Sequence, residues 1–320
     1  MMDQALQTMV EGARQALDSR GATIGETGAD RRFELFHGAN SICSQKVRTV
    51  LAHHGLPWLG HTVNMFLGQT YLPGYVRLRM LGCEAVGGAL VSHHTGSTSM
   101  SAGGCDGAVV PTLVDWQTSE VVVDSKRICL HLDGCVADAD RLRPASLAEA
   151  IDHELAVVDN MPNYQLLMGR KANPSESETT RTGVGGLFSQ RKVAWCESYL
   201  EENAGDATLV AAYTAKRAKE LSAAQALFSP DAMRAAYNWA ESALRSFEDR
   251  LEARPGPWLF GDAVTLGDLF WGIELLRMKN MGVATFWEAG RLPNVERFSA
   301  QTEALTSIRC AIVDWPGAMF

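Results

Sequence analysis

The chain has 320 residues, of which 46% are hydrophobic and 21% charged, so it can form roughly two globular domains and is not expected to be disordered. Its net charge is −8 and its lysines and arginines are scattered, which argues against nucleic acid or an anionic membrane surface as a partner. No apolar run approaches the ~20 residues that a membrane helix needs.

The first 30 residues are predicted to form a leader ahead of the first domain. Met1 to Leu17 contains acidic residues and glutamines and lacks the compact apolar stretch of a signal peptide. Gly21 to Asp30 is expected to be flexible. The segment before it has the spacing of a short amphipathic helix, because one stripe would carry Leu6, Met9, Val10, Ala13 and Leu17.

Seven cysteines occur, and no two of them form a CxxC pair. An odd number in a chain without an evident export signal favours free thiols in a reducing compartment, so we expect a cytoplasmic protein. Neither His53-His54 nor His93-His94 lies at zinc-finger distance from cysteines, so we expect no metal site.

Two strands and a helix are predicted at the start of the first domain. Arg32 to His37 alternates apolar and polar residues, as a half-buried strand does. Asn40 and Ser41 can cap a helix over Cys43 to His54, which Gly55 ends. Trp58 to Asn64 is a plausible second strand.

A long surface loop is predicted next, over residues 82–107, because this segment is rich in Gly, Ser and Thr. Val109 to Asp115 is strand-like, and Glu120 to Val123 can pair with it as a hairpin. Asp124 or Ser125 can then cap a helix. This order of elements predicts an α/β layer architecture for residues 31–137, with the loop 82–107 as an insertion.

Residues 144–320 show only helical periodicity, so we expect an all-helical second domain, with the boundary near Asp138 to Asp140. Breaks are expected at residues 173–186, 229–230 and 255–261. The candidate helices are residues 146–168, 191–203, 209–227, 231–253 and 266–279.

The first group of residues that points to chemistry is Ser41 to Arg48, at a strand-to-helix turn. The start of a helix offers unpaired N–H donors and about half a positive charge. A cysteine there ionises more easily, and the thiolate is the attacking species. Ser41 could donate a hydrogen bond to a bound sulfur anion. Taken alone, the pattern is also that of a small core residue, Cys43, beside an ordinary cap.

Two further features lie downstream. If the Val110–Pro111 peptide bond were cis, the Val110 backbone would be left unpaired and could bind an extended peptide; a trans proline would simply begin the strand. Ser125, at a helix start after Asp124, could hold a carboxylate through its hydroxyl and backbone N–H, or Asp124-Ser125 could be only a cap.

Together, these three features resemble the N-terminal domain of glutathione transferases. The resemblance implies a thioredoxin-like fold for the first domain and glutathione as the co-substrate. In that family the helix-start Ser or Cys addresses the glutathione sulfur, the residue before the cis-proline pairs with the cysteinyl backbone, and the acid-Ser pair binds the γ-glutamyl end. The corresponding residues are Ser41 or Cys43, Val110 with Pro111, and Asp124 with Ser125.

The second domain agrees with this resemblance. The segment from Pro257 to Leu269 resembles the C-terminal signature of the same family. It also has a physical explanation of its own, because Thr265 can cap a helix while Asp268 reaches back to it, as in a capping box. We therefore interpret Asp268 as structural rather than catalytic. The resemblance covers roughly residues 32–316.

A narrower resemblance is to the zeta-like branch, which holds maleylacetoacetate isomerases and bacterial reductive dehalogenases of chlorinated hydroquinones. Ile42 departs from the isomerases, which usually carry a second Ser there. The dehalogenase resemblance implies attack by glutathione on a chlorinated aromatic ring and resolution of the conjugate by Cys43. The stretches similar to the dehalogenases are residues 32–37, 43–48, 75–79, 109–115, 124–130 and 256–262.

Several alternatives remain open from the sequence. A glutathione conjugase or β-etherase would need only Ser41, an isomerase would have no net redox chemistry, and a non-catalytic relative would only bind ligands. A homodimer is expected by resemblance. Candidates for handling phenolic protons are His37, His93 and His94, and aromatic residues that could line the acceptor site or equally be core are Tyr164, Tyr213, Trp239 and Trp271.

Overall fold

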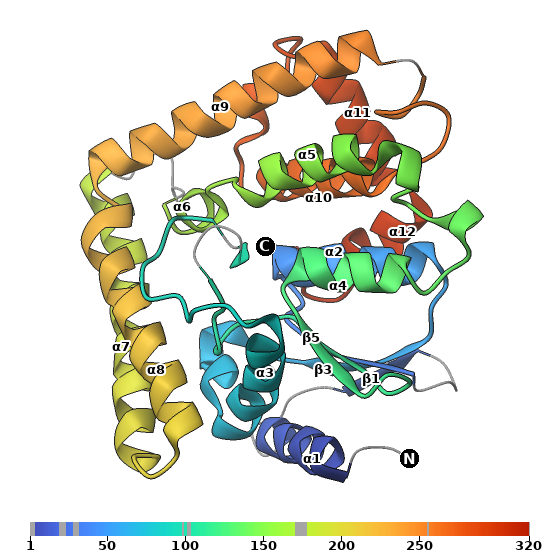
Figure 1. The fold of residues 1–320 in the computed structure, drawn as a ribbon. Coiled ribbons are helices and arrows are strands. Elements are labelled where there is room, and N and C mark those ends of the chain that lie inside the picture. The colour runs from blue at the N-terminus through green and yellow to red at the C-terminus, as the bar shows by residue number, and fades with distance from the viewer. Residues whose placement is uncertain are drawn as a thin grey trace.

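The computed structural model describes residues 4–18, 24–27, 32–97, 99–100, 104–169, 178–254 and 256–319. A small sheet flanked by helices forms one side of the molecule, and a group of helices forms the other (Figure 1). The predicted order, an α/β first part followed by a helical second part, is confirmed.

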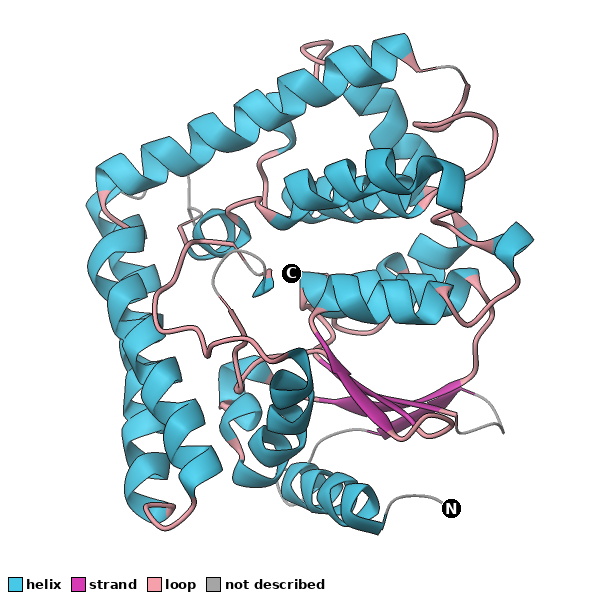
Figure 2. Cartoon of the chain, viewed as in Figure 1, coloured by secondary structure: helices cyan, strands magenta, loops and turns pink. Residues whose placement is uncertain are grey.

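The sheet has five strands in the order β1-β3-β2-β4-β5; β2 and β3 are parallel, and the other three neighbouring pairs are antiparallel (Figure 2). In that pair Phe33 lies opposite Trp58. The predicted hairpin is β4 with β5. The strands are β1 (Ile24–Thr27), β2 (Phe33–His37), β3 (Trp58–Thr62), β4 (Thr112–Asp115) and β5 (Glu120–Val123).

Alternation along β2 divides the core between the two faces of the sheet. Phe33 and Leu35 are buried against α2 (Ile42–His53) and α4 (Ser125–Asp133), which lie on one face. Phe36 is buried on the other face against α1 (Gln4–Asp18) and α3 (Pro73–Val86). The predicted strand therefore separates two helical layers.

The amphipathic helix expected near the N-terminus is α1, and its predicted stripe is confirmed because Leu6, Val10, Ala13 and Leu17 are all buried against the domain. Arg14 of α1 makes a two-pronged ion pair with the buried Glu34 of β2, at 2.6 and 2.7 Å.

The prediction that residues 21–30 are flexible is wrong in part. Within residues 21–30, the four residues of β1 extend the sheet by pairing with β3, which completes a hydrogen-bonding edge that β3 would otherwise expose. The remainder of that segment lies outside the described residues.

The second part is helical, and its longest buried element is α10, whose residues 266–278 are all buried. Lys46 of α2 joins the two parts through a buried ion pair with Asp159 of α5, at 3.0 Å. The helices are α5 (Ala148–Asp159), α6 (Asn163–Met168), α7 (Glu178–Glu202), α8 (Ala207–Ser222), α9 (Pro230–Ala253), α10 (Leu266–Asn280), α11 (Pro293–Glu303) and α12 (Thr306–Ile308).

Two predictions about the helices are wrong. The candidate over residues 146–168 is two helices, because Pro162 cannot continue α5. The break expected at residues 173–186 overlaps α7, which begins at Glu178 although its first turns contain several glycines. The candidate over residues 209–227 is confirmed as α8, followed directly by a π-helical turn at Ala223–Leu227.

The segment 82–107 is not the surface loop that its composition indicates. Its first residues belong to α3, and Val91, His94 and Asp106 are buried. Leu90 pairs with Cys105 in an isolated bridge, which brings Cys105 beside α3. There it forms a disulfide with Cys83, so the expectation of free thiols throughout the chain is wrong for these two cysteines.

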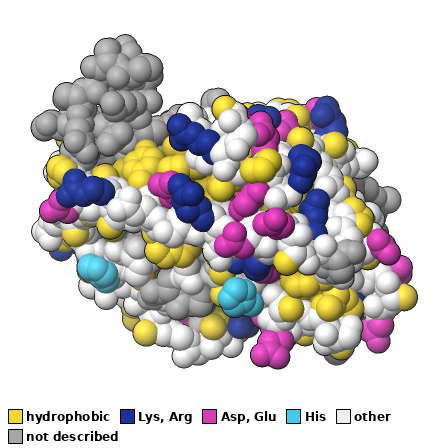
Figure 3. Space-filling model, turned by 90° about the horizontal axis from the view of Figure 1, so that it is seen from above, with side chains coloured by type: hydrophobic (Ala, Val, Ile, Leu, Met, Phe, Trp, Pro, Cys, Tyr) yellow, Lys and Arg dark blue, Asp and Glu magenta, His cyan; other side chains and the backbone are white. Residues whose placement is uncertain are grey.

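Charged side chains of both signs are interspersed on the face shown in Figure 3, rather than gathered by sign. No helix in the described part of the chain is long and apolar enough to cross a membrane.

The predicted capping box at the start of α10 is confirmed, and it is fully buried. Asp268 accepts hydrogen bonds from the N–H groups of Thr265 and Leu259, at 2.8 and 2.9 Å. Asp268→Ala would leave these donors unpaired and is expected to lower the free energy of unfolding by about 2–4 kcal/mol. Denaturant unfolding measures this, with the exposed Asp262→Ala as a control within about 0.5 kcal/mol of wild type. Equal stability of both variants would contradict the assignment.

Glu34 makes stability depend on pH. Burial acts to raise the pKa of this carboxyl, but hydrogen bonds from His61 and Arg14 outweigh it and lower the pKa to about 2. Because the folded pKa lies below the ordinary value of 4.5, the stabilisation is complete above that pH and is lost as the pH falls towards 2.

We expect Glu34→Gln to remove on the order of 3 kcal/mol of this acid-dependent stability, so that its unfolding free energy changes less between pH 5 and 2 than that of wild type. Urea unfolding across this range measures the difference. Glu84→Gln, at an exposed carboxylate, is the matched control. Parallel pH profiles for wild type and Glu34→Gln would overturn the expectation.

Candidate active site

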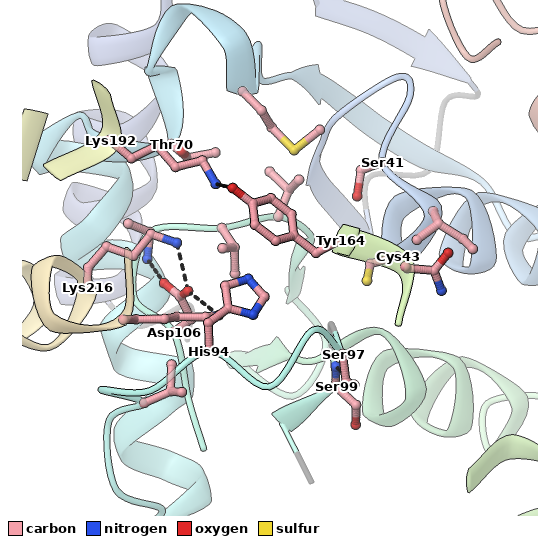
Figure 4. A pocket seen from close by; sticks show the side chains of 18 of the residues that line it. Ser41, Cys43, Thr70, His94, Ser97, Ser99, Asp106, Tyr164, Lys192 and Lys216 are labelled. Atoms are coloured by element: carbon pink, nitrogen blue, oxygen red, sulfur yellow. Dashed lines mark hydrogen bonds and ion pairs between the residues drawn. The ribbon is translucent and has the colours of Figure 1, made fainter. Parts of the chain in front are cut away.

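A cavity of about 200 Å³ lies between the sheet domain and the helical part. Its walls come from the start of α2, the segment before β4, the start of α4, and helices α6, α7 and α8 (Figure 4). All six predicted site residues line this cavity, namely Ser41, Cys43, Val110, Pro111, Asp124 and Ser125.

The start of α2 carries two of these residues on neighbouring positions of one turn. Ser41 is the N-cap, and its Oγ accepts the N–H of Ser44 at 3.3 Å. Ser44 in turn accepts the N–H of Gly38 at 3.1 Å, which closes the turn. Cys43 is a free cysteine in the first turn of the helix and is 8% exposed. Ser41 and Cys43 thus lie beside each other at the cavity (Figure 4).

A buried arginine fixes the turn that precedes this helix. Arg48 donates hydrogen bonds to the carbonyl oxygens of Gly38 and Ala39, at 3.1 and 2.8 Å. It also donates to the carbonyl oxygen of Ala311 near the C-terminal end, at 3.0 Å, and lies over the ring of Trp315. The helix start is therefore held from the side away from the cavity.

The Val110–Pro111 peptide bond is cis, which the sequence left open. The carbonyl oxygens of the two residues beside Val110 accept hydrogen bonds, because the Tyr75 hydroxyl donates to that of Val109 at 2.6 Å and the Arg79 guanidinium donates to that of Pro111. The backbone N–H and C=O of Val110 itself make no hydrogen bond within the described residues. They line the cavity and can pair with an extended peptide.

The start of α4 supplies the third predicted feature. Asp124 is the N-cap, and one carboxylate oxygen accepts the N–H groups of Lys126 and Arg127 at 3.1 and 3.2 Å. Its other oxygen accepts the N–H of Met100, which ties the inserted segment to the cavity rim. The Ser125 hydroxyl faces the same cavity and has no hydrogen-bond partner in the part of the chain described here.

The opposite wall is a buried cluster of charges that our sequence analysis did not predict. Asp106, from the inserted segment, accepts from both Lys216 and Lys219 of α8, at 2.8 and 2.9 Å. Glu220 pairs with Lys216 at 3.0 Å and with Lys192 of α7 at 3.2 Å. We call these five residues the charge cluster. The spacing of Lys216, Lys219 and Glu220 places them on one helical face, which could have indicated the α8 part of this cluster but not its partner Asp106.

Attraction from the neighbouring lysines keeps the two carboxylates of the charge cluster ionised. Burial would raise the pKa of Glu220, but the ammonium groups of Lys192 and Lys216 lower it to about 2. Burial likewise opposes ionisation of Asp106, and Lys216 and Lys219 hold its pKa well below the ordinary value. For Lys219, burial dominates and lowers the pKa, with Asp106 opposing the shift and Lys216 adding to it.

Two rings connect this cluster to the middle of the cavity. The Tyr164 hydroxyl accepts from Lys192 at 3.0 Å and contacts Ser189 at 2.9 Å. His94 stacks on the Tyr164 ring, with centroids 4.5 Å apart. Its Nδ1 accepts the N–H of Gly96, so the neutral ring carries its proton on Nε2. In Figure 4, Tyr164 lies between the thiol side and the charge cluster.

The other histidine and aromatic residues that the sequence suggested for the substrate side are found in three places: the cavity, the core and the surface. His93 and Tyr164 line the cavity along with His94. His37 does not, because its ring is packed against Trp58 and Trp315, and burial with the nearby Arg48 lowers its pKa. Tyr213 and Trp271 are buried in the core, and Trp239 is partly exposed away from the cavity.

The fold and this arrangement of helix start, cis-proline and acid-Ser pair define a class of glutathione-using proteins. Solved structures share the fold at low identity. A β-etherase of Sphingobium sp. strain SYK-6 is 13% identical with a TM-score of 0.56, over 88% of this chain and 98% of that one. A glutathione transferase of Populus trichocarpa is 15% identical with a TM-score of 0.53, over 87% and 96%.

Closer relatives in sequence define the family. Residues 40–134 match the family model of the glutathione S-transferase N-terminal domain. Proteins named 2,5-dichlorohydroquinone reductive dechlorinase, from two strains of Sphingobium indicum, are 36% identical over 295 residues, which is 91% of this chain and 85% of theirs. The chain belongs to the glutathione S-transferase family.

Proposed function

We propose that this protein is a glutathione-dependent reductive dehalogenase of a chlorinated hydroquinone. The observation that carries the proposal is the presence of two groups for sulfur chemistry, Ser41 and Cys43, at one helix start in one cavity. The activity named for the Sphingobium relatives supports it. A family member that only conjugates glutathione needs a single such group.

In this proposal the predicted residues hold glutathione against the sheet domain. The Val110 backbone pairs with the cysteinyl part of the tripeptide, and Pro111 shapes the turn that leaves it unpaired. The Ser125 hydroxyl and the start of α4 bind the γ-glutamyl carboxylate, while Asp124 accepts from the γ-glutamyl ammonium. The glutathione sulfur then lies at the start of α2, where Ser41 donates to it.

The proposed reaction has three steps. The glutathione thiolate attacks the chlorinated carbon of the quinone-like tautomer, a C–S bond forms and chloride leaves. The Cys43 thiolate then attacks the ring-bound sulfur, so that the C–S electron pair stays on the ring carbon, which takes up a proton. A second glutathione thiolate resolves the Cys43–glutathione disulfide. Two glutathione molecules are oxidised to the disulfide as one C–Cl bond becomes C–H.

We also propose a glutathione-binding domain at residues 31–137, a substrate domain at residues 144–320, a homodimer and a cytoplasmic location. The direct test of the function is incubation with glutathione and 2,5-dichlorohydroquinone, with chloride release as the readout. No chloride from any chlorinated hydroquinone would overturn the proposal.

Ser125→Ala is expected to weaken glutathione binding by about 1–3 kcal/mol, because it removes a hydrogen bond to a charged carboxylate. Calorimetric titration with glutathione measures the change. Ser198→Ala removes an exposed hydroxyl on α7 and is the matched control. Unchanged glutathione affinity in Ser125→Ala would contradict the assigned role.

Cys43→Ser separates the two sulfur steps. Glutathione is the first nucleophile, so the variant should still release chloride. The second step should stop, because a serine hydroxyl is not ionised near neutral pH and cannot take part in a disulfide exchange. Mass spectrometry should therefore detect a glutathionyl-hydroquinone conjugate in place of the dechlorinated product. Ser41→Ala should slow chloride release with no conjugate accumulating.

Cys310→Ser, which replaces an exposed free cysteine, is the matched control and should behave as wild type. Fully reduced product from Cys43→Ser at the wild-type rate would make Cys43 a packing residue. A wild-type enzyme that stops at the conjugate would be a conjugating transferase, and return of glutathione without net consumption would indicate an isomerase.

A further inference from the structure

We propose that Lys219, Lys192 and the Tyr164 hydroxyl bind one hydroxyl oxygen of the aromatic substrate as an oxyanion. This inference rests on the proposed function, since it assigns the substrate side of the same cavity. It concerns three residues that line the cavity and that our sequence analysis did not link to glutathione.

The charge cluster has more positive than negative groups. Among the residues that the structure describes, the three ammonium groups of Lys192, Lys216 and Lys219 are paired with two carboxylates, those of Asp106 and Glu220. Lys216 lies between both carboxylates and is the most fully compensated. Burying an uncompensated ammonium is costly, so the cluster favours an anion in the adjacent space.

Hydrogen-bond counting identifies the donors that remain. An ammonium group has three donors. Lys219 uses one, to Asp106, within the described residues, and its side chain is 13% exposed at the cavity. Lys192 donates to the Tyr164 hydroxyl and to Glu220, so one of its donors makes no hydrogen bond to the part of the chain that the structure describes. The Tyr71 hydroxyl, buried in the same wall, has no hydrogen-bond partner among the residues described.

The side chains around the ammonium groups of Lys192 and Lys219 can accommodate an aromatic ring that carries a hydroxyl substituent. The stacked rings of His94 and Tyr164 lie between the donors and the thiol side (Figure 4). An aromatic substrate can stack on such a platform while its oxygen reaches the ammonium groups. A hydroquinone has two hydroxyls on opposite edges, so one can be held here while a ring carbon faces the glutathione sulfur.

Binding as an oxyanion has a chemical consequence for the proposed reaction. When the O–H bond breaks, the proton goes to solvent and the electron pair delocalises onto the ring. The negative charge delocalised onto the ring allows a ring carbon to take up a proton from solvent, and this gives the quinone-like tautomer. Fixed ammonium groups beside the oxygen stabilise this charge without reorganising. Lys219 and Lys192 would thereby act on the substrate before either sulfur does.

The experiment uses 4-nitrophenol, whose ionised form is coloured and which carries no chlorine to displace. A spectrophotometric titration of the bound phenol gives its apparent pKa. The wild-type protein is expected to lower that pKa by about one to two units relative to free 4-nitrophenol. The other ionisable groups that line the cavity also contribute to the pH profile of the bound phenol. They are Cys43, Tyr71, Arg79, His93, His94, Asp106, Asp124, Tyr164, Lys192, Lys216, Lys219, Glu220 and Arg277.

Lys219→Met should abolish most of this shift, and Lys219→Arg should restore it. Lys192→Met should reduce the shift by itself. In each methionine variant the facing carboxylate keeps Lys216 as a partner, so folding is expected to survive and is checked by circular dichroism. The matched control is Arg217→Met, which removes an exposed positive charge two positions before Lys219 on α8.

The outcomes separate the proposals. No shift in wild type, or an equal shift in wild type and Lys219→Met, overturns the oxyanion site. So does a tenfold loss of glutathione affinity in Lys219→Met with the phenol titration unchanged, because the cluster would then bind glutathione. Chloride release by wild type is measured separately, so a protein that shifts 4-nitrophenol but never dechlorinates keeps the site and loses the proposed function.

Discussion

The geometry of the cavity depends on one buried guanidinium, that of Arg48. It faces away from the ligand side and donates to backbone carbonyls from two ends of the chain, Gly38 and Ala39 before α2 and Ala311 near the C-terminus. Ser41 therefore keeps the extended conformation of an N-cap, and Cys43 keeps its place in the first turn. The C-terminal segment therefore helps to position the Cys43 thiol, although its described residues 311–319 do not line the cavity.

Elements whose signals are local were predictable from the sequence. The N-cap at Ser41, the hairpin of β4 and β5, and the Thr265–Asp268 capping box each depend on residues within a few positions of one another, and each is found. The stripe of α1 is equally local, since apolar spacing alone selects its buried face. The cavity position of the six predicted site residues follows because short turns bring them to one edge of the sheet.

Features that depend on long-range contacts were not predictable in the same way. Asp106 and Lys216 are 110 residues apart, and nothing near either one indicates that they meet. The Gly- and Ser-rich composition of residues 82–107 predicted a surface loop, but several of these residues are held by hydrogen bonds to other elements. The N–H of His94 donates to Ser222, and the Ser97 hydroxyl donates to the carbonyl oxygen of Asp159. The strand β1 was missed because only the edge of β3 makes it a strand.

The inserted segment between α3 and β4 is attached at its far end by two bonds of different kinds on consecutive residues. Cys105 is joined covalently to α3, and Asp106 is joined ionically to α8. These two bonds fix the end of the segment that carries His94 into the cavity. Because the N–H of Met100 also bonds Asp124, a change in this segment would reach both the aromatic wall and the start of α4.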